Sequence, residues 1–346
     1  MAGRERTLSQ RELNRSLLAR QLLLERARLP LPRTLERMGG LQAQYAPSMY
    51  VGLWSRVEGF RRGVLTHALE RREVVQATLM RVTIHLVSAE DYWPLAVAVR
   101  AARRTYWLRA MRGEATAADL EEAAEQLRHR LLEGPIRRSE LDQLVGKSRS
   151  IGVGLWVDLV RAPPSGTWER RRADLFASAE SWLGPPAVTP EEADELLVRR
   201  YLTGFGPSTA AELADWAGLP TGEVAPVLER LPLRLFRAED GQVLFDLPRS
   251  PLPDAATPAP VRFLPTWDAI LLVHARRKAI LPEAYRPLVF STKNPHSVST
   301  FLVDGAVAGT WKYEEGRVRL EPFEPLPSSV RRGLEDEAER LAAFHS

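Results

Sequence analysis

Apolar residues recur at helical spacing through most of the chain and at alternate positions near its C-terminus. The stretch Pro248–Pro260 is rich in proline and separates the two patterns, so we expect it to be a linker. The pattern before it predicts helices at Ser9–Arg26, Pro32–Met38, Ser48–Val57 and Arg61–Arg71, a hairpin of Val74–Leu79 with Val82–Val87, and a helix that begins at Ser88.

Two segments of the chain, Gly134–Gly146 and Gly206–Gly218, resemble each other. Both begin with Gly-Pro, carry Glu and Leu at matching positions and end with Gly. Gly-Pro favours a sharp turn, apolar residues three apart favour a short helix, and the final Gly favours its end. This order is typical of the second helix of a helix-turn-helix.

The segments around the second repeat complete such a unit. Thr189-Pro190 is a strong helix start, because it combines a side-chain cap with proline at the first helical position. Asp240-Gly241 is a favoured hairpin turn. The expected elements are a helix from Thr189 to about Leu202, a helix at Gly222–Arg230 capped by Thr221, and strands at Leu233–Arg237 and Gln242–Leu247. Three helices followed by a two-stranded ribbon make a winged helix.

The first repeat shows the same order of elements. We expect a helix at about Ala117–Glu133, the repeat helix, a helix at Gly152–Val160, and a wing that holds Arg170–Arg172. The helices and hairpin before Ser88 predict a similar unit at the N-terminus.

Turn dipeptides and alternating segments dominate the chain after the linker. Strands are expected at Val261–Leu264, Val298–Val303, Ala306–Tyr313 and Arg317–Pro322, and a final helix at about Pro327–Phe344. We therefore predict an α+β fold, mainly α, with tandem winged-helix modules followed by a small C-terminal antiparallel β-barrel. The predicted units are residues 1–115, 116–187, 188–250 and 251–346.

The amino-acid composition excludes several kinds of chemistry and bounds the class of protein. The 346 residues include no cysteine, which excludes disulfides and thiolate chemistry, and six histidines without an HExxH pattern, so we expect no metal or other cofactor. A hydrophobic content of 45% and a charged content of 27% are globular values. We see no signal peptide and no apolar run of membrane-spanning length, and expect a cytoplasmic, nucleoid-associated monomer. The net charge of +4 supports nucleic-acid binding only weakly, so local arginine clusters matter more.

Leu41-Gln42-Ala43-Gln44, directly after Gly39-Gly40, is the most distinctive short segment. Side chains two apart project to one side only when the backbone is extended. The two glycines favour this, because they end the preceding helix and open a turn. Two amides on such a loop suit the orientation of a water molecule or a nucleotide. The same segment also suits a polar connection between helices with no chemical role.

Several ordered motifs together resemble the AlkZ/YcaQ family of DNA glycosylases across nearly the whole chain. They are Gly39–Gln44 with Ser48–Arg56, Arg81–Val87 leading into Ser88–Asp91, the Gly-Phe-Gly-Pro turn at 204–207, and Asp268–Lys278. The resemblance implies tandem winged helices and a β-barrel that grip duplex DNA and remove N7- or N3-alkylated purines, including bulky adducts and, in some members, interstrand crosslinks. It implies a catalytic Gln-x-Gln pair at Gln42 and Gln44.

This pair is chemically suited to such substrates. N7 alkylation makes the purine cationic, so the leaving group needs little protonation. Amide oxygens can place water against C1′ and stabilise the developing oxocarbenium cation by dipole and hydrogen bond. Glutamine is a poor base, so unmodified bases should not be cleaved.

Further residues are expected to contact DNA. Arg81, Thr83 and His85 lie on the predicted hairpin, although the family usually has Gly where this chain has Val82. His85 could equally pack under the next helix. The others are Arg170, Arg171, Arg172, His274, Arg277 and Lys278, with Arg276 standing where the family usually has an acid.

Two other functions fit parts of this pattern. A non-catalytic winged-helix regulator would explain the repeats and basic wings, but not the Gln-Ala-Gln loop. A small-molecule enzyme using the barrel cavity would need a nucleophile with its base, a phosphate loop or a metal motif, and the sequence has none.

Overall fold

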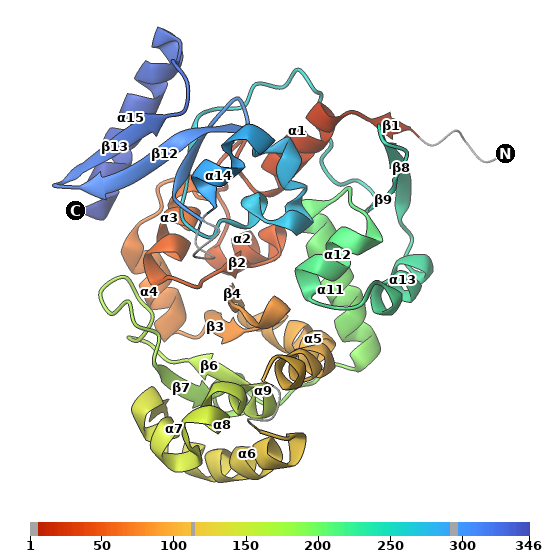
Figure 1. The fold of residues 1–346 in the computed structure, drawn as a ribbon, viewed down its shortest axis with the longest axis vertical. Helices are drawn as coiled ribbons and strands as arrows, with labels where there is room; N and C mark the ends of the chain where they lie inside the picture. Colours follow the sequence, from red (N-terminus) through yellow and green to blue (C-terminus); the bar gives the residue numbers. More distant parts are fainter. Residues whose placement is uncertain (1–5, 112–114, 291–296) are drawn as a thin grey trace.

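A six-stranded sheet lies at the centre of the computed structural model, which describes residues 6–111, 115–290 and 297–346 (Figure 1). Its strand order is β2-β4-β3-β6-β7-β5. The sheet therefore contains strands from both sides of the predicted boundary at residues 115 and 116, and β3 and β6 pair where the two sets meet.

The N-terminal helices and hairpin lie close to the predicted ranges. The elements are β1 Thr7–Leu8, α1 Gln10–Arg20, α2 Leu31–Met38, β2 Leu41–Gln42, α3 Ala46–Arg56, α4 Arg62–Glu70, β3 Val74–Thr78, the 3₁₀ turn η1 Met80–Val82, β4 Ile84–Ser88 and α5 Ala89–Ala110. The first helix is shorter than predicted, because the chain turns away after Arg20 and Leu22 adopts a φ of 58°. Ser88 caps α5 by accepting from the Asp91 amide at 3.1 Å.

The next segment follows the helix-strand-helix order but differs from the prediction at its third helix. Its elements are α6 Ala117–Leu131, β5 Ile136–Arg137, α7 Arg138–Val145, α8 Lys147–Gly152, α9 Gly154–Val157, β6 Leu159–Arg161, β7 Leu175–Ser178 and α10 Ala179–Leu183. The predicted helix Gly152–Val160 is confirmed only for Gly154–Val157, which forms α9. Asp158 has a φ of 54°, which a helix cannot contain, and the chain continues as β6.

The second repeat also forms the predicted succession of helices and ribbon. Its elements are α11 Pro190–Phe205, α12 Ala210–Ala217, α13 Thr221–Arg230, β8 Arg234–Ala238 and β9 Val243–Asp246. Pro220, not Thr221, occupies the cap position of α13. The sequence pattern did not predict that β1 adds to this ribbon, where it pairs in parallel with β8.

The C-terminal sheet is open, so the predicted closed barrel is wrong. The elements here are β10 Arg262–Leu264, four short 3₁₀ turns (η2 Ala269–Leu271, η3 Val273–Ala275, η4 Arg277–Ala279 and η5 Glu283–Tyr285), α14 Arg286–Val289, β11 Thr300–Val303, β12 Ala306–Glu314, β13 Arg317–Pro322 and α15 Ser328–His345. The strands pair in the order β10-β11-β12-β13, and among the described residues neither edge closes on the other. Leu334 and Leu341 of α15 pack into the same core as Phe263 and Phe301, so a helix covers the apolar residues that closure would otherwise bury.

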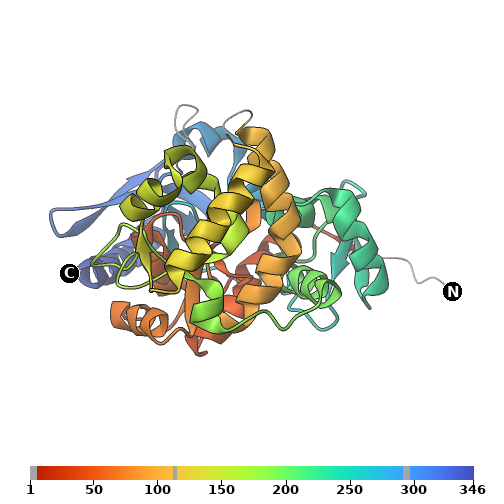
Figure 2. The same cartoon turned by 90° about the horizontal axis from the view of Figure 1, so that it is seen from below.

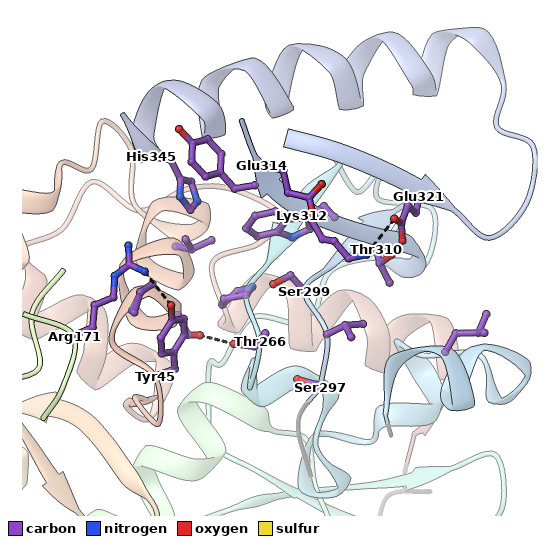
Figure 3. A pocket seen from close by; sticks show the side chains of 18 residues that line it. Tyr45, Arg171, Thr266, Ser297, Ser299, Thr310, Lys312, Glu314, Glu321 and His345 are labelled. Atoms are coloured by element: carbon purple, nitrogen blue, oxygen red, sulfur yellow. Dashed lines mark hydrogen bonds and ion pairs between the residues drawn. The ribbon is translucent and has the colours of Figure 1, made fainter. Parts of the chain in front are cut away.

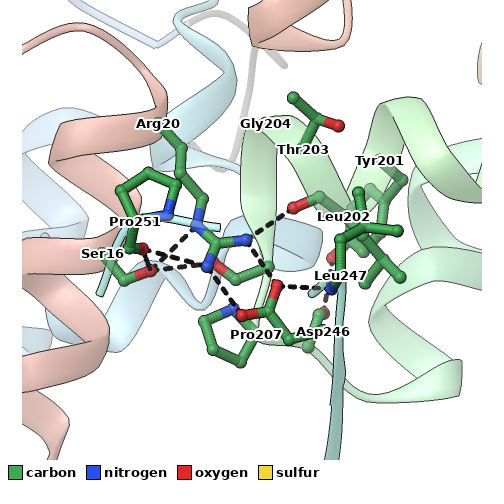
Figure 4. A network of polar contacts seen from close by, with 12 residues as sticks. Ser16, Arg20, Tyr201, Leu202, Thr203, Gly204, Pro207, Asp246, Leu247 and Pro251 are labelled. Atoms are coloured by element: carbon green, nitrogen blue, oxygen red, sulfur yellow. Dashed lines mark hydrogen bonds and ion pairs between the residues drawn. The ribbon is translucent and has the colours of Figure 1, made fainter. Parts of the chain in front are cut away.

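Buried ion pairs tie distant segments together. Arg20 of α1 and Asp246 of β9 are both 0% exposed and form two hydrogen bonds, of 2.7 and 2.9 Å (Figure 4). Arg56 of α3 pairs in the same way with Asp268, whose carboxylate also accepts from the Ile270 amide. The N-terminal helices are thus fixed to both later parts of the chain. In both views β1 and α15 lie on opposite sides of the molecule (Figure 1 and Figure 2).

Candidate active site

The Gln-Ala-Gln segment begins as the short strand β2, so Gln42 is extended as the sequence predicts, while Gln44 lies at a bend beyond the strand. Gly39 ends α2 in the left-handed region, with a φ of 76°, and Gly40 follows at 80°. The chain then enters β2, where Gln42 pairs with His85 across to β4. A side chain on Gly40 would come within 3.0 Å of Val87, so the turn needs glycine for both conformation and space.

Gln42 is held in the interior by an arginine. Its side chain is 6% exposed, and its Oε1 accepts a hydrogen bond of 3.2 Å from Arg81 Nη2. Arg81 lies in η1, between β3 and β4, and also donates to the carbonyl of Trp216 at the end of α12. Burial lowers the pKa of Arg81 to about 10, so it remains a cation at neutral pH. Arg81 therefore fixes the orientation of the Gln42 amide.

Gln44 is exposed and only partly engaged. Its Oε1 accepts a hydrogen bond of 3.2 Å from the Ile84 amide, while the Ala43 amide donates to the Ile84 carbonyl at 2.7 Å. A carbonyl oxygen has two lone pairs and the amide nitrogen has two hydrogens, so further bonding capacity remains. Gln44 is thus anchored to β4 and still open to a ligand or a water molecule.

The other hairpin residues serve the local structure. Thr83 Oγ1 donates to the Met80 carbonyl at 3.0 Å. His85 is 3% exposed, with Nδ1 3.0 Å from the Thr83 carbonyl. Burial, with the nearby charge of Arg81, lowers the pKa of His85 to about 3, so it is neutral. A neutral interior ring is not placed to touch phosphate, and we do not retain His85 as a DNA contact.

Of the residues predicted near the end of the Asp268–Lys278 motif, Arg277 and Lys278 line one pocket of about 420 Å³, whereas His274 is buried outside it. His274 is 3% exposed and packs edge-on against Phe205 at 5.0 Å, and burial holds its pKa well below the usual range. The prediction that its side chain contacts DNA is therefore not retained. Arg277 lies over Phe290, with its guanidinium carbon 5.3 Å from the ring centre, and Lys278 is exposed. Arg276 pairs with Glu212 at 3.0 Å.

The arginine cluster lies in an exposed loop between β6 and β7. Arg170, Arg171 and Arg172 are all exposed. Arg171 Nη1 donates to the Tyr45 hydroxyl at 3.3 Å, whereas Arg172 pairs with Asp174 at 3.2 Å. This loop therefore reaches the residue that directly follows Gln44.

Tyr45 and Arg171 also line a cavity of about 610 Å³, to which Gln44 is linked through its neighbour Tyr45 (Figure 3). The start of α3, the segment after β10 and strand β12 form other parts of its wall, and β12 contributes Trp311 and Lys312. Lys312 Nζ donates to Glu321 Oε1 at 3.3 Å, on the side of the cavity away from Tyr45 (Figure 3). The sequence pattern did not identify Tyr45 or Lys312. Only the position of Tyr45 beside Gln44 could have indicated it.

The part of the chain that the structure describes contains neither a group of side chains suited to bind a metal ion nor a helix suited to span a membrane. No three histidine, aspartate or glutamate side chains are grouped there in a way that could hold a metal ion. Nor does any helix in those ranges combine the length and apolar character needed to cross a bilayer.

Known proteins place the chain in a family. A search of curated proteins gave no significant sequence match. The solved structure of DNA glycosylase AlkZ from Streptomyces sahachiroi is similar in fold, with a TM-score of 0.82 and 21% identity over 98% of this chain and 97% of that one. The family model for DNA glycosylase AlkZ-like proteins matches residues 35–344. This chain therefore belongs to the AlkZ-like DNA glycosylase family.

Proposed function

We propose that this protein hydrolyses the N-glycosidic bond of N7- or N3-alkylated purines in duplex DNA, bulky adducts and interstrand crosslinks included. The observation that carries the proposal is the exposed Gln44 side chain, anchored by the Ile84 amide and followed directly by Tyr45, which lines the 610 Å³ cavity and accepts from Arg171. Family membership supports an enzyme that acts on DNA.

The two glutamines have different roles in this mechanism. Gln44 holds the attacking water against C1′ through the free lone pair of its Oε1, and its dipole stabilises the oxocarbenium cation that develops as the bond breaks. Gln42, oriented by Arg81, lines the inner side of the site and positions the sugar. The departing purine is already cationic and leaves as a neutral base, so no general acid is needed, and the proton that the water loses on bonding to C1′ passes to solvent.

The cavity suits a large substrate. At about 610 Å³ it falls within the range of small-molecule sites, and its walls belong to separate elements of the chain. A bulky adduct could lie there without complete extrusion of its nucleotide into a tight pocket. The Tyr45 ring would stack on a base and the Arg171 cation would pair with a phosphate, so the two groups of one nucleotide would each have a partner.

We predict monofunctional, metal-independent excision. Water is the nucleophile and amides are the only catalytic groups, so excess EDTA should leave the rate unchanged and the product should be an intact strand with an abasic site. Gel analysis with and without hot alkali measures both. Borohydride added during the reaction should trap no protein–DNA adduct. A trapped adduct, or loss of activity on chelation, would refute water attack positioned by amides.

We predict that the arginine loop binds DNA phosphates. Replacing Arg170, Arg171 and Arg172 with alanine should weaken binding equally across duplex sequences, and should flatten the dependence of log affinity on log salt by about one unit for each phosphate that is no longer neutralised. Fluorescence anisotropy at several salt concentrations measures the slope. Arg171→Ala alone should produce part of this change, and Arg199→Ala on α11 is the control. A strong sequence preference with an unchanged slope would favour a regulator instead.

A further inference from the structure

The turn η1 places Arg81 beside Gln42 at a cost in backbone strain. Arg81 and Val82 follow one another in the left-handed region, with φ values of 52° and 58°. Residues other than glycine rarely adopt this region, and a β-branched valine is a clear outlier there. Such strain persists only where the surroundings hold it, and it gathers at functional sites. Here the Thr83 amide donates to the Met80 carbonyl at 3.1 Å and closes the turn.

The end of α12 supports the same turn from outside the hairpin. Gly218 ends α12 with a φ of 75°, and a side chain there would lie 3.0 Å from the backbone nitrogen of Arg81. Arg81 Nη1 donates to the Trp216 carbonyl, near the C-terminal end of α12, where the helix dipole favours a cation. Within the described residues, the other acceptor of Arg81 is Gln42 Oε1, at 3.2 Å. Arg81 therefore joins the end of α12 to Gln42.

This contact decides which end of the Gln42 amide is free. A guanidinium group can only donate, so the atom that it meets is the amide oxygen, and Nε2 points elsewhere. Nε2 has no hydrogen-bond partner among the described residues, yet it keeps accessible surface, although Gln42 as a whole is only 6% exposed. The free end of Gln42 is thus a pair of N–H donors, whereas Gln44 still offers a lone pair of its oxygen.

The two ends of a breaking glycosidic bond have opposite requirements. When the C1′–N9 bond of an alkylated purine breaks, its electron pair passes to the purine and C1′ becomes cationic. An N–H donor that faced C1′ would raise the barrier. A donor to the purine lowers it, because the ring nitrogens gain electron density only as the bond breaks. The oxygen of Gln44 therefore suits the cation, and the free nitrogen of Gln42 suits the departing base.

We propose that Arg81 is a positioning residue, which holds the oxygen of the Gln42 amide so that Nε2 donates a hydrogen bond to the departing purine. Arg81 touches no substrate in this arrangement and acts on the reaction only through Gln42. The inference rests on the proposed function, since it assigns a role to Gln42 within base excision, besides positioning the sugar. The electron pair of the broken bond stays with the purine, water bonds to C1′, and the proton that the water loses passes to solvent.

A double-mutant cycle of Arg81→Met and Gln42→Ala tests this coupling by single-turnover excision from a duplex with one N7-methylguanine. In the wild-type background Arg81→Met should lower the rate by about 10- to 100-fold, the size expected when a group is misplaced by about 1 Å. In the Gln42→Ala background it should lower the rate by less than about twofold, because the group through which Arg81 acts is already absent. Affinity for the same duplex should change little, since the donated hydrogen bond forms only as the base leaves.

Gln42→Glu separates the donor from the contact with Arg81. A carboxylate still accepts from Arg81, but it has no N–H at neutral pH. The melting temperature should therefore not fall, whereas excision should be as slow as in Gln42→Ala. This variant leaves Arg81 in place, so it tests the proposal even if Arg81→Met fails to fold. Arg104→Met is the matched control, because Arg104 donates to the Leu155 and Trp156 carbonyls of α9 and does not contact Gln42, and its rate should equal that of the wild type.

The outcomes distinguish this coupling from a purely structural role and from failure of the proposed function. If Arg81 only supported the fold, Arg81→Met would lower the rate by the same factor in both backgrounds, and the proposal would be wrong. A wild-type rate for Gln42→Glu would also overturn it, because Gln42 would then not act as a donor. Weaker DNA binding at an unchanged rate would assign the donor to a phosphate, against the proposal. Absence of base release by the wild-type protein would instead contradict the proposed function, and this inference with it.

Discussion

Replacing Gln44 with alanine is expected to lower the single-turnover rate of base excision by about two to three orders of magnitude. This is the usual size of the loss when one preorganised dipole at a developing charge is removed. The side chain is exposed and its one hydrogen bond, to the Ile84 amide, is at the surface, so the fold should tolerate the change. Gln42→Ala should also be impaired, because Arg81 then loses the amide it orients.

A duplex with a single N7-methylguanine provides the substrate for this comparison, with the protein in excess. DNA affinity should change little in both variants, since the effect lies in the chemical step. Gln126→Ala, at an exposed position on α6, is the matched control and should behave as wild type. Rates near wild type in both the Gln42 and Gln44 variants would remove the catalytic assignment of the pair.

Asp246→Asn is expected to lower the free energy of unfolding by about 3–5 kcal/mol, the typical cost of leaving a buried partner charge uncompensated. Arg20 would keep its bonds to Ser16 Oγ and to the Leu202 and Pro251 carbonyls, but its charge would be unpaired at 0% exposure. The contact joins α1 to β9, so its removal should loosen the N-terminal helices from the ribbon (Figure 4).

Urea unfolding, followed by tryptophan fluorescence and circular dichroism, measures this loss. Glu125→Gln removes one partner of an exposed pair with Arg128 and is the matched control, with an expected change below about 1 kcal/mol. If both substitutions cost the same, the buried pair would have no special part in joining these segments.

Local patterns in the sequence predicted most helices and the hairpins β3–β4 and β8–β9, because caps, turn residues and periodicity act over a few positions. Gly39 illustrates this: its position after α2 predicted a helix end, and the structure has it in the left-handed region. The extended conformation of Gln42 followed from the same local reasoning. Leu22 and Asp158 are exceptions, since nothing in their own sequence context favours φ values of 58° and 54° over a continuing helix.

Features that depend on distant partners were not predictable. Whether His274 faces DNA or the interior is decided by the Phe205 ring, which is far away in sequence. His85 lies opposite Gln42 of β2, a pairing that its own strand does not specify. The open C-terminal sheet depends on where α15 packs. The parallel pairing of β1 with β8 joins Thr7 to Arg237, far along the chain, and no pattern within either strand specifies it. The Arg81–Gln42 contact belongs to the same class.

Release of the modified base is the measurement that tests the central claim most directly. Wild-type protein in excess is incubated with duplex DNA that carries one N7-methylguanine, and the free base and the abasic strand are quantified against the rate without protein. The account predicts free N7-methylguanine and alkali-labile strand in equal amounts, formed far faster than by spontaneous loss, with an unmodified duplex untouched. Tight binding to that duplex with no base released above the spontaneous rate would contradict it.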